Sequence, residues 1–360
     1  MATQRQLLTD EARALIGFHA PSQTSSDTVN SSEIRRFAQA VMDDHRIWYD
    51  EKIASASRFG GLVAPGTFPI TTLRPQPHAP DSLRTAGVRD EMYQVAITRD
   101  LPEIPGLEGM YHFHAGDDIE FRRLARVGDR MTANPSLHAI YEKTGRSGTL
   151  VFVTTRTEWV NQDSDVVCVH DQNLVYTEGT RQRGSAGGPA RQRSGDPPPM
   201  PQSEPLDLVR TDFEDVEEGQ ELSQRQFRIT VPIVMRWAAA TEGFRRDHYD
   251  YEYATQVAGL PNIIGSALWT LSCRWSYLNQ IAGADGWVWK MSHQVRGHIM
   301  VGDNLTISGR VVEKERCDGY GLVKVEVAFV NQDGETVIPG HGTIALPFRG
   351  GTAVPYPFSP

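Results

Sequence analysis

Alternation of apolar and polar residues predicts strands in the last third of the chain. The stretches Leu305–Val312 and Leu322–Val330 alternate with a period of two residues, as expected for strands that are half buried. Asp318-Gly319 and Asp333-Gly334 supply turn residues after each stretch. The pattern therefore predicts an antiparallel meander.

Helical periodicity precedes these strands and also occurs near the start of the chain. Between Ser266 and Ala282 apolar residues recur at three- and four-residue steps, and Gly283 supplies a stop signal. Shorter helices are predicted at four further places, which are Glu33–Met42, Asp50–Ser57, Pro232–Thr241 and Asp250–Val257. Helices followed by an antiparallel meander favour the α+β class.

Three short motifs occur twice, in the same order, and indicate an internal duplication. The pairs are Asp43–Asp50 with Gly243–Asp250, Val127–Asp129 with Val301–Asp303, and Val160–Asp163 with Val330–Asp333. Their offsets are 200, 174 and 170 residues. The shrinking offset indicates about 26 extra residues in the first copy, which we place in the Pro-rich stretch of about 75–105.

A segment poor in apolar residues separates the two copies. Residues 179–205 are rich in Gly, Ser, Pro and Arg, as is typical of a flexible linker. Two bodies of ordinary domain size remain on either side. The predicted organisation is an extended polar lead-in over 1–32, a first domain over 33–178, the linker over 179–205, a second domain over 206–348 and a tail over 349–360.

Composition narrows the classes of partner. The net charge of −9 argues against nucleic acid, and no apolar run is long enough to span a membrane. The three cysteines, Cys168, Cys273 and Cys317, fit neither a disulfide framework nor a zinc spacing. We therefore expect a protein of the cytoplasm that binds neither nucleic acid nor membrane.

Three stretches resemble the MaoC-like, (R)-specific enoyl-CoA hydratase family. Glu242–Ala254 resembles the family's active-site motif, in which a histidine follows an aspartate by five residues. Arg58–Pro69 and His114–Phe121 are typical of the FAS1-like N-terminal half of two-domain acyl dehydratases. The resemblance implies a double hot-dog fold, in which each half wraps a curved antiparallel sheet around one long helix.

The resemblance also implies a reaction and a site. Family members add or remove water at a 2-enoyl or 3-hydroxyacyl thioester, carried by CoA or by an acyl carrier protein, without a further cofactor. His248 matches the catalytic histidine that acts as acid and base. The backbone amides of Gly265 and Ser266, at the start of the predicted long helix, are expected to stabilise the enolate oxygen.

The motif lacks its acid in the second copy. Gly243 occupies the aspartate position, and Glu242 and Asp247 beside it are candidate substitutes or ordinary solvated charges. Arg246 matches an arginine found in some two-domain relatives, and serves either the reaction or the fold.

The first copy has the opposite defect. It keeps Asp43 but has Trp48 in place of the histidine, and an indole N–H cannot accept a proton. We expect this half to be catalytically degenerate, with Asp43 forming the polar end of the preceding helix.

Several functions remain open at this point. The chain is a hydratase or dehydratase, a drifted relative that catalyses elimination, isomerisation or cyclisation on a specialised metabolite, or a non-catalytic partner subunit that binds acyl groups. A homodimer is expected and a hetero-complex is possible. His112, His114, Asp117 and Asp118 could be mistaken for a metal site, but they match the family's strand and no metal is expected.

Overall fold

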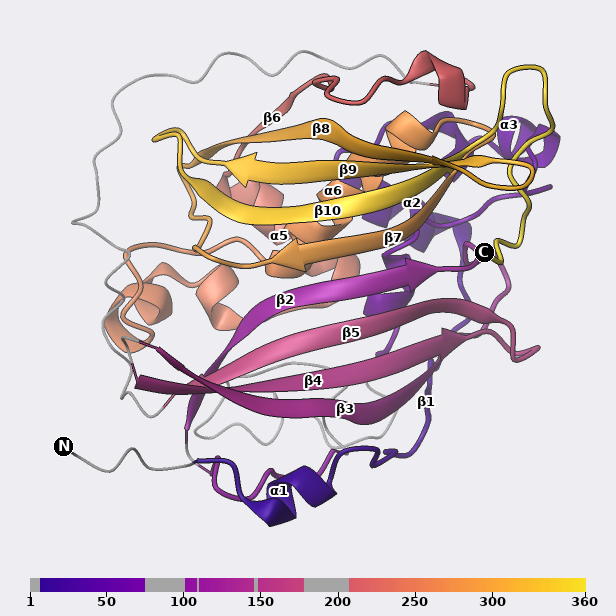
Figure 1. Cartoon of the computed structure of the whole chain (residues 1–360). Helices are drawn as coiled ribbons and strands as arrows, with labels where there is room; N and C mark the ends of the chain where they lie inside the picture. The colour runs from indigo at the N-terminus through magenta and orange to yellow at the C-terminus, as the bar shows by residue number, and fades with distance from the viewer. Residues whose placement is uncertain (1–6, 75–100, 109, 146–147, 178–206) are drawn as a thin grey trace.

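One ten-stranded antiparallel sheet runs through both halves of the protein (Figure 1). The computed structural model describes residues 7–74, 101–108, 110–145, 148–177 and 207–360. The predicted linker and residues 75–100 of the predicted insert lie outside these residues. Along the sheet the strand order is β1-β3-β4-β5-β2-β7-β10-β9-β8-β6.

The elements follow the predicted order in both halves. In the first half they are α1 (Asp10–Ala14), β1 (Gln23–Thr24), α2 (Ser31–Ala40), the 3-10 helix η1 (Arg46–Trp48), α3 (Glu51–Ala56), the 3-10 helix η2 (Phe68–Thr71), β2 (Tyr111–Phe121), β3 (Thr132–Gly145), β4 (Gly148–Val160) and β5 (Val166–Thr177). In the second half they are the 3-10 helix η4 (Phe213–Asp215), β6 (Arg225–Arg228), α5 (Val231–Thr241), the 3-10 helix η5 (Arg246–His248), the π-helix η6 (Tyr253–Val257), α6 (Ala267–Ala282), β7 (Trp287–Gln294), β8 (Asn304–Arg316), β9 (Gly321–Val330) and β10 (Thr336–Leu346).

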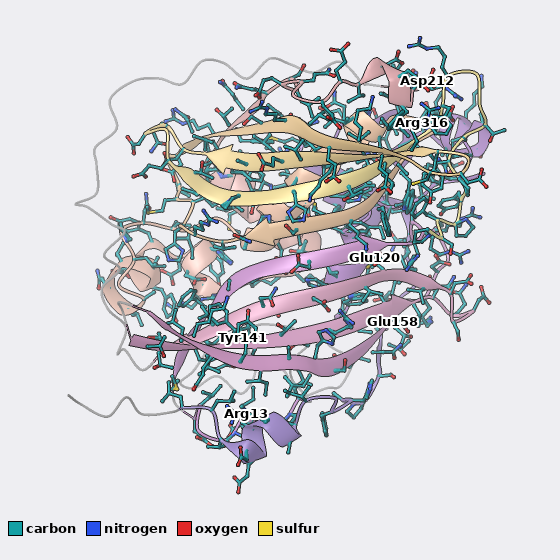
Figure 2. The ribbon with its side chains drawn as sticks, viewed as in Figure 1. Arg13, Glu120, Tyr141, Glu158, Asp212 and Arg316 are labelled. Carbon is teal, nitrogen blue, oxygen red and sulfur yellow. The ribbon has the colours of Figure 1, made fainter. Side chains whose placement is uncertain are left out.

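The strand order is symmetric about the pairing of β2 with β7. Reading outward from this central pair, β5, β4, β3 and β1 on one side correspond to β10, β9, β8 and β6 on the other. The predicted double hot-dog fold of the α+β class is therefore confirmed, and the two halves share one sheet. α2, α5 and α6 lie on one face of this sheet (Figure 1). The opposite face carries Glu120, Tyr141 and Glu158 (Figure 2).

The repeated motifs form the same hydrogen bonds in both halves. Asp129 and Asp303 each accept the backbone N–H three residues earlier, at 2.7 Å. Gln162 and Gln332 each accept the N–H of the residue that follows this aspartate, at 2.9 and 3.0 Å. These side chains accept hydrogen bonds from turn N–H groups that strand pairing leaves without an acceptor. This explains why both copies carry these motifs.

Helix α6 is the long helix predicted for the second half. It ends where predicted, because Gly283 adopts a φ of 68° there. The helix is buried along most of its length between the sheet and the first half. In the first half the corresponding segment begins with η2, and residues 75–100, where we place the Pro-rich insert, lie outside the described part.

Both ends of the described chain pack more closely than predicted. The lead-in is not simply extended, since it contains α1, whose Ala12 is buried in a small apolar cluster with β3 and β4. Within the tail, Val354 and Phe358 are only 2% and 1% exposed. Arg58 holds the tail by donating to the carbonyl oxygen of Val354 at 2.5 Å. Among the described residues, no helix is long and apolar enough to cross a membrane.

The central strand pair depends on a close approach at Gly116. A Cβ atom at this position would lie 2.2 Å from the carbonyl oxygen of His293 on β7, which is backbone and cannot rotate away. We predict that Gly116→Ala lowers the free energy of unfolding by about 1–3 kcal/mol or more, because the strands must separate locally. The midpoint of urea unfolding measures this effect. Gly61→Ala is the matched control, since nothing lies within 4 Å of a Cβ there. An equal loss of unfolding free energy in both variants would contradict the prediction.

Candidate active site

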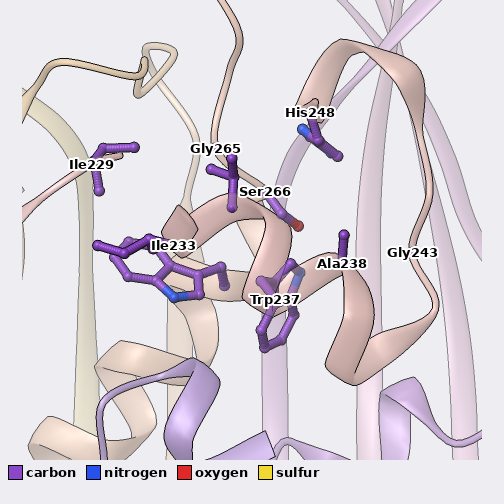
Figure 3. Close-up of a pocket in the computed structure, with 10 residues that line it drawn as sticks. Ile229, Ile233, Trp237, Ala238, Gly243, His248, Gly265 and Ser266 are labelled. Atoms are coloured by element: carbon purple, nitrogen blue, oxygen red, sulfur yellow. The ribbon is translucent and has the colours of Figure 1, made fainter. Parts of the chain in front are cut away.

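A small cavity that opens to solvent lies between α5, η5 and the start of α6. Gly243, His248, Gly265 and Ser266 form its polar part (Figure 3). The structure thus brings together three predicted site residues and the position of the missing acid. The remaining lining residues are apolar, and they are Ile229, Ile233, Val234, Trp237, Ala238 and Trp269. This combination of apolar walls and a few polar groups is typical of small-molecule sites.

The His248 imidazole is held in one tautomer. Its Nδ1 lies 2.9 Å from the carbonyl oxygen of Ile264, which can only accept, so Nδ1 carries the proton in the neutral ring. The Nε2 atom has no hydrogen-bond partner among the described residues. His248 is only 15% exposed at its side chain. The result is a neutral imidazole that offers the Nε2 lone pair as a base.

Burial lowers the pKa of His248 below its ordinary value. The carboxylate of Asp247 opposes this effect, and the guanidinium of Arg245 adds to it. Asp247 is buried, and its Oδ2 accepts from Arg245 Nε at 2.9 Å. Its Oδ1 lies 3.9 Å from Nδ1 of His248. Asp247 therefore acts on the Nδ1 side of the ring, away from the free lone pair.

No carboxylate is among the residues that line the cavity. Glu242, at the left-handed C-cap of α5, pairs with Arg74 at 3.2 Å and its side chain is 48% exposed. A Cβ at Gly243 would lie 3.2 Å from Thr241 Oγ1, so a side chain there would have to displace that hydroxyl slightly. Neither candidate substitute thus takes the place of the missing aspartate in this arrangement.

Arg246 has a structural role in this arrangement. It contacts the Asp250 carboxylate at 2.7 and 2.9 Å and lies 4.5 Å from the centroid of the Tyr253 ring. Arg46 forms the same ion pair with Asp50, at 3.0 Å, in the half without a catalytic histidine. The pair appears in both halves, so it belongs to the fold of the motif, which favours the structural one of the two predicted roles.

The start of α6 corrects one predicted role. The N–H of Gly265 donates to the carbonyl oxygen of Ile299 at 2.9 Å and so is not free for a ligand. Gly265 is required for packing, because a Cβ there would lie 2.6 Å from Cδ1 of Ile299. The N–H groups of Ser266 and Ala267 have no acceptor among the described residues, and the Ser266 side chain does not cap the helix. Backbone donors without an acceptor among the described residues thus remain at the positive end of α6.

The first half has lost the equivalent groups. Trp48 occupies the position at which the second half has its histidine. Its Nε1 donates to Oδ1 of Asp43 at 2.8 Å. Asp43 is 3% exposed, so it is a buried hydrogen-bonded carboxylate and not the polar helix end that we expected. The bridges Val63 to Arg126 and Ile264 to Met300 are equivalent, and they place Pro65, which has no N–H, at the position of Ser266.

The His112 to Asp118 segment forms an ion-pair cluster. Asp117 is buried and contacts Nε2 of His114 at 3.0 Å and Nε2 of His170 at 2.8 Å. Burial alone would raise the pKa of Asp117, but the two histidines hold it far below its ordinary value. His112 instead packs against the ring of Tyr176. Within the described residues, no group of histidine, cysteine and carboxylate side chains is arranged to hold a metal ion.

Sequence reasoning missed the apolar wall of the cavity. One face of α5 carries three of these residues, Val234, Trp237 and Ala238. The helical spacing of these apolar residues could have predicted that face from the sequence. Trp269 gave no such signal, because α6 is buried on most sides.

The fold and the cavity together define a class of protein. Residues 14–170 match the family model described as the FAS1-like, dehydratase domain region. A solved structure called a MaoC-like dehydratase superposes with a TM-score of 0.67 at 17% identity, over 94% of this chain and 99% of that one. A double hot-dog protein from Mycobacterium tuberculosis gives a TM-score of 0.57 at 14% identity, over 96% of this chain and all (100%) of that one.

The chain therefore has the double hot-dog fold of MaoC-like dehydratases, and its first half is similar to the FAS1-like dehydratase region. The predicted resemblance is confirmed. Among characterised proteins, the sequence is 27% identical over 168 residues to mesaconyl-C(4)-CoA hydratase of Chloroflexus aurantiacus. That match covers 46% of this chain and 48% of the hydratase, so it spans about half of each protein.

The environment of His248 predicts how the ring titrates. Burial and Arg245 disfavour the imidazolium while Asp247 favours it, so its pKa lies below the ordinary value of about 6.5. We predict that Asp247→Asn lowers this pKa further, because it removes the favourable anion and leaves Arg245 unpaired. NMR titration of the His248 ring protons, assigned with His248→Gln, measures both values. A rise in the pKa of His248 in Asp247→Asn would contradict this account.

Proposed function

We propose that the protein is a hydro-lyase that adds water to, or removes it from, a 2-enoyl or 3-hydroxyacyl thioester. The observation that carries this proposal is a largely apolar cavity lined both by His248, whose Nε2 is free, and by Ser266, whose amide is unpaired at the start of α6. A base, an oxyanion site and an acyl-binding wall are the three parts that the reaction needs. The name of the Chloroflexus relative supports a CoA thioester.

The described residues that line the cavity supply one base and no partner acid, so we propose that His248 transfers the proton twice. In hydration, Nε2 removes a proton from water as the hydroxyl adds to C3 of the enoyl group. The electrons move to the thioester oxygen, and the Ser266 and Ala267 amides stabilise the resulting enolate. The imidazolium then returns its proton to C2. Dehydration follows the same steps in reverse, so atoms and charge balance in both directions.

The low pKa of His248 suits this role. A ring that is neutral at neutral pH is ready to accept the proton from water, and it becomes a strong acid once charged. The dipole of α6 favours the negative enolate oxygen at the same time.

A second candidate is an elimination or isomerisation on a different carbonyl compound. The absence of a carboxylate from the cavity lining favours it, because one base suffices to move a proton between neighbouring carbons. Turnover of an enolisable substrate that is not a thioester, lost in His248→Gln, would support this candidate. Location in the cytoplasm, a homodimer or a hetero-complex, and the choice between CoA and acyl carrier protein stay predictions.

Hydration is tested with trans-2-butenoyl-CoA by following the absorbance of the conjugated thioester. We expect the wild type to remove this absorbance and His248→Gln to lose about 10²–10⁴-fold in kcat/KM, the usual contribution of a general acid–base group. Glu242→Gln is the control and should keep its activity, because Glu242 pairs with Arg74 outside the cavity lining. Equal activity of wild type and His248→Gln, or none in the wild type with any enoyl-CoA, would refute the proposal.

The oxyanion site is tested at Ser266, whose φ of −71° suits proline. Ser266→Pro removes the N–H and the hydroxyl, whereas Ser266→Ala removes the hydroxyl alone. We expect Ser266→Pro to lower kcat by about 10²–10³-fold relative to Ser266→Ala, as for loss of one oxyanion donor. The same kcat in both folded variants, checked by circular dichroism, would exclude the Ser266 amide from the reaction.

A further inference from the structure

We infer that the first half of the protein sets the depth of the acyl cavity, and thereby restricts the site to short acyl groups. Two indoles of the second half, Trp237 and Trp269, close the apolar end of the cavity, and groups of the first half fix both of them. The inference rests on the proposed function, since it concerns the acyl part of the same substrate.

Both indoles belong to the apolar part of the cavity lining. Trp237 is 4% exposed and Trp269 is 2% exposed, and both line the cavity with His248 and Ser266. In the view of Figure 3, Ser266 lies between His248 and Trp237. A thioester whose oxygen binds at the start of α6 directs its alkyl chain toward the apolar residues, because the other lining positions are polar or backbone. The chain then meets the Trp wall, which we define as Trp237 and Trp269.

Trp269 is fixed by a hydrogen bond across the two halves. Its Nε1 donates to the carbonyl oxygen of Ala40, the last residue of α2, at 2.9 Å. The ring of Phe227 packs edge-on against it, with 5.4 Å between centroids. If the indole rotated away, the Nε1 donor and the Ala40 carbonyl would both be left buried without this hydrogen bond, which is unfavourable.

Trp237 is fixed by packing against the same helix. Phe37 of α2 lies 5.5 Å from Trp237 between ring centroids and is fully buried. Phe37 is supported from behind by Phe68, edge-on at 5.4 Å. Close-packed interiors do not yield space for a longer chain without displacing these rings. The limit on chain length therefore originates in α2 and η2, which do not line the cavity themselves.

This arrangement predicts that a change in the first half alters substrate preference without touching the reacting atoms. In Phe37→Leu the smaller side chain lets Trp237 tilt back, which deepens the cavity. We compare trans-2-butenoyl-CoA with trans-2-octenoyl-CoA as substrates. Wild type should have a higher kcat/KM for the butenoyl substrate than for the octenoyl substrate. Phe37→Leu should raise the ratio of kcat/KM for octenoyl over butenoyl by about tenfold or more, because one methylene changes kcat/KM by at least about tenfold in such pockets.

Phe121→Leu is the matched control. Phe121 is equally buried, but it packs 6.3 Å from Trp275 and does not line the cavity or contact the Trp wall. The Phe121→Leu variant should lose stability without a change in the ratio of kcat/KM for the two substrates.

If Phe37→Leu does not fold, Phe37→Met and the cavity-filling variant Ala238→Val replace it. Ala238→Val should lower the octenoyl to butenoyl ratio, since Ala238 lines the cavity.

A binding measurement separates failure of this inference from failure of the proposed function. Calorimetric titration with the saturated butanoyl-CoA and octanoyl-CoA needs no turnover, and the affinity ratio should shift in the same direction as the kinetic ratio. A wild type that prefers the longer chain, or folded variants with an unchanged ratio in both measurements, would overturn the inference and leave the hydro-lyase proposal standing. An inactive wild type whose binding ratio still shifts would refute only the hydro-lyase proposal.

Discussion

The pairing of β2 with β7 is the interaction on which the rest of the structure depends. It makes two five-stranded sheets continuous, and it brings α2 of the first half against α5 of the second. Gly116 permits the approach, because its missing side chain leaves room for the β7 backbone. Without this pair the Trp wall would lose the groups that support it from behind. The shape of the candidate site in one half thus depends on the junction between both halves.

The two halves differ in their chemistry while keeping the same scaffold. Both halves keep the Arg–Asp ion pair and the aspartate at each turn. Both also keep the glutamine that accepts the N–H of the residue after that aspartate. The groups that differ are those at the candidate site. Trp48 replaces the histidine and forms a hydrogen bond to Asp43, and Pro65 removes the amide that Ser266 offers. The buried Asp43 in the first half is therefore stabilised by an indole donor, and it no longer has a base beside it.

Much of the fold could be predicted from the sequence because its signals are local or repeated. The alternation over Leu322–Val330 and the stop at Gly283 mark elements whose bounds differ from the structure by at most a few residues. The position of His248 followed from its motif, and its place in the cavity agrees. Which N–H is free could not be predicted, since Gly265 donates to Ile299, which lies 34 residues further along the chain. The orientation of Asp247 and the burial of Asp43 also depend on residues brought near by folding.

The symmetric strand order has a consequence for how such a site can change. Two identical subunits that assemble into the same sheet must carry every substitution twice, once in each copy. A single chain with both copies is free of this requirement, so one copy can exchange its histidine for tryptophan while the other keeps it. Because the two copies are joined in one chain, they can carry different residues at equivalent positions, which the two subunits of a homodimer cannot do. One copy keeps the histidine, and the other keeps the groups that pack behind the Trp wall.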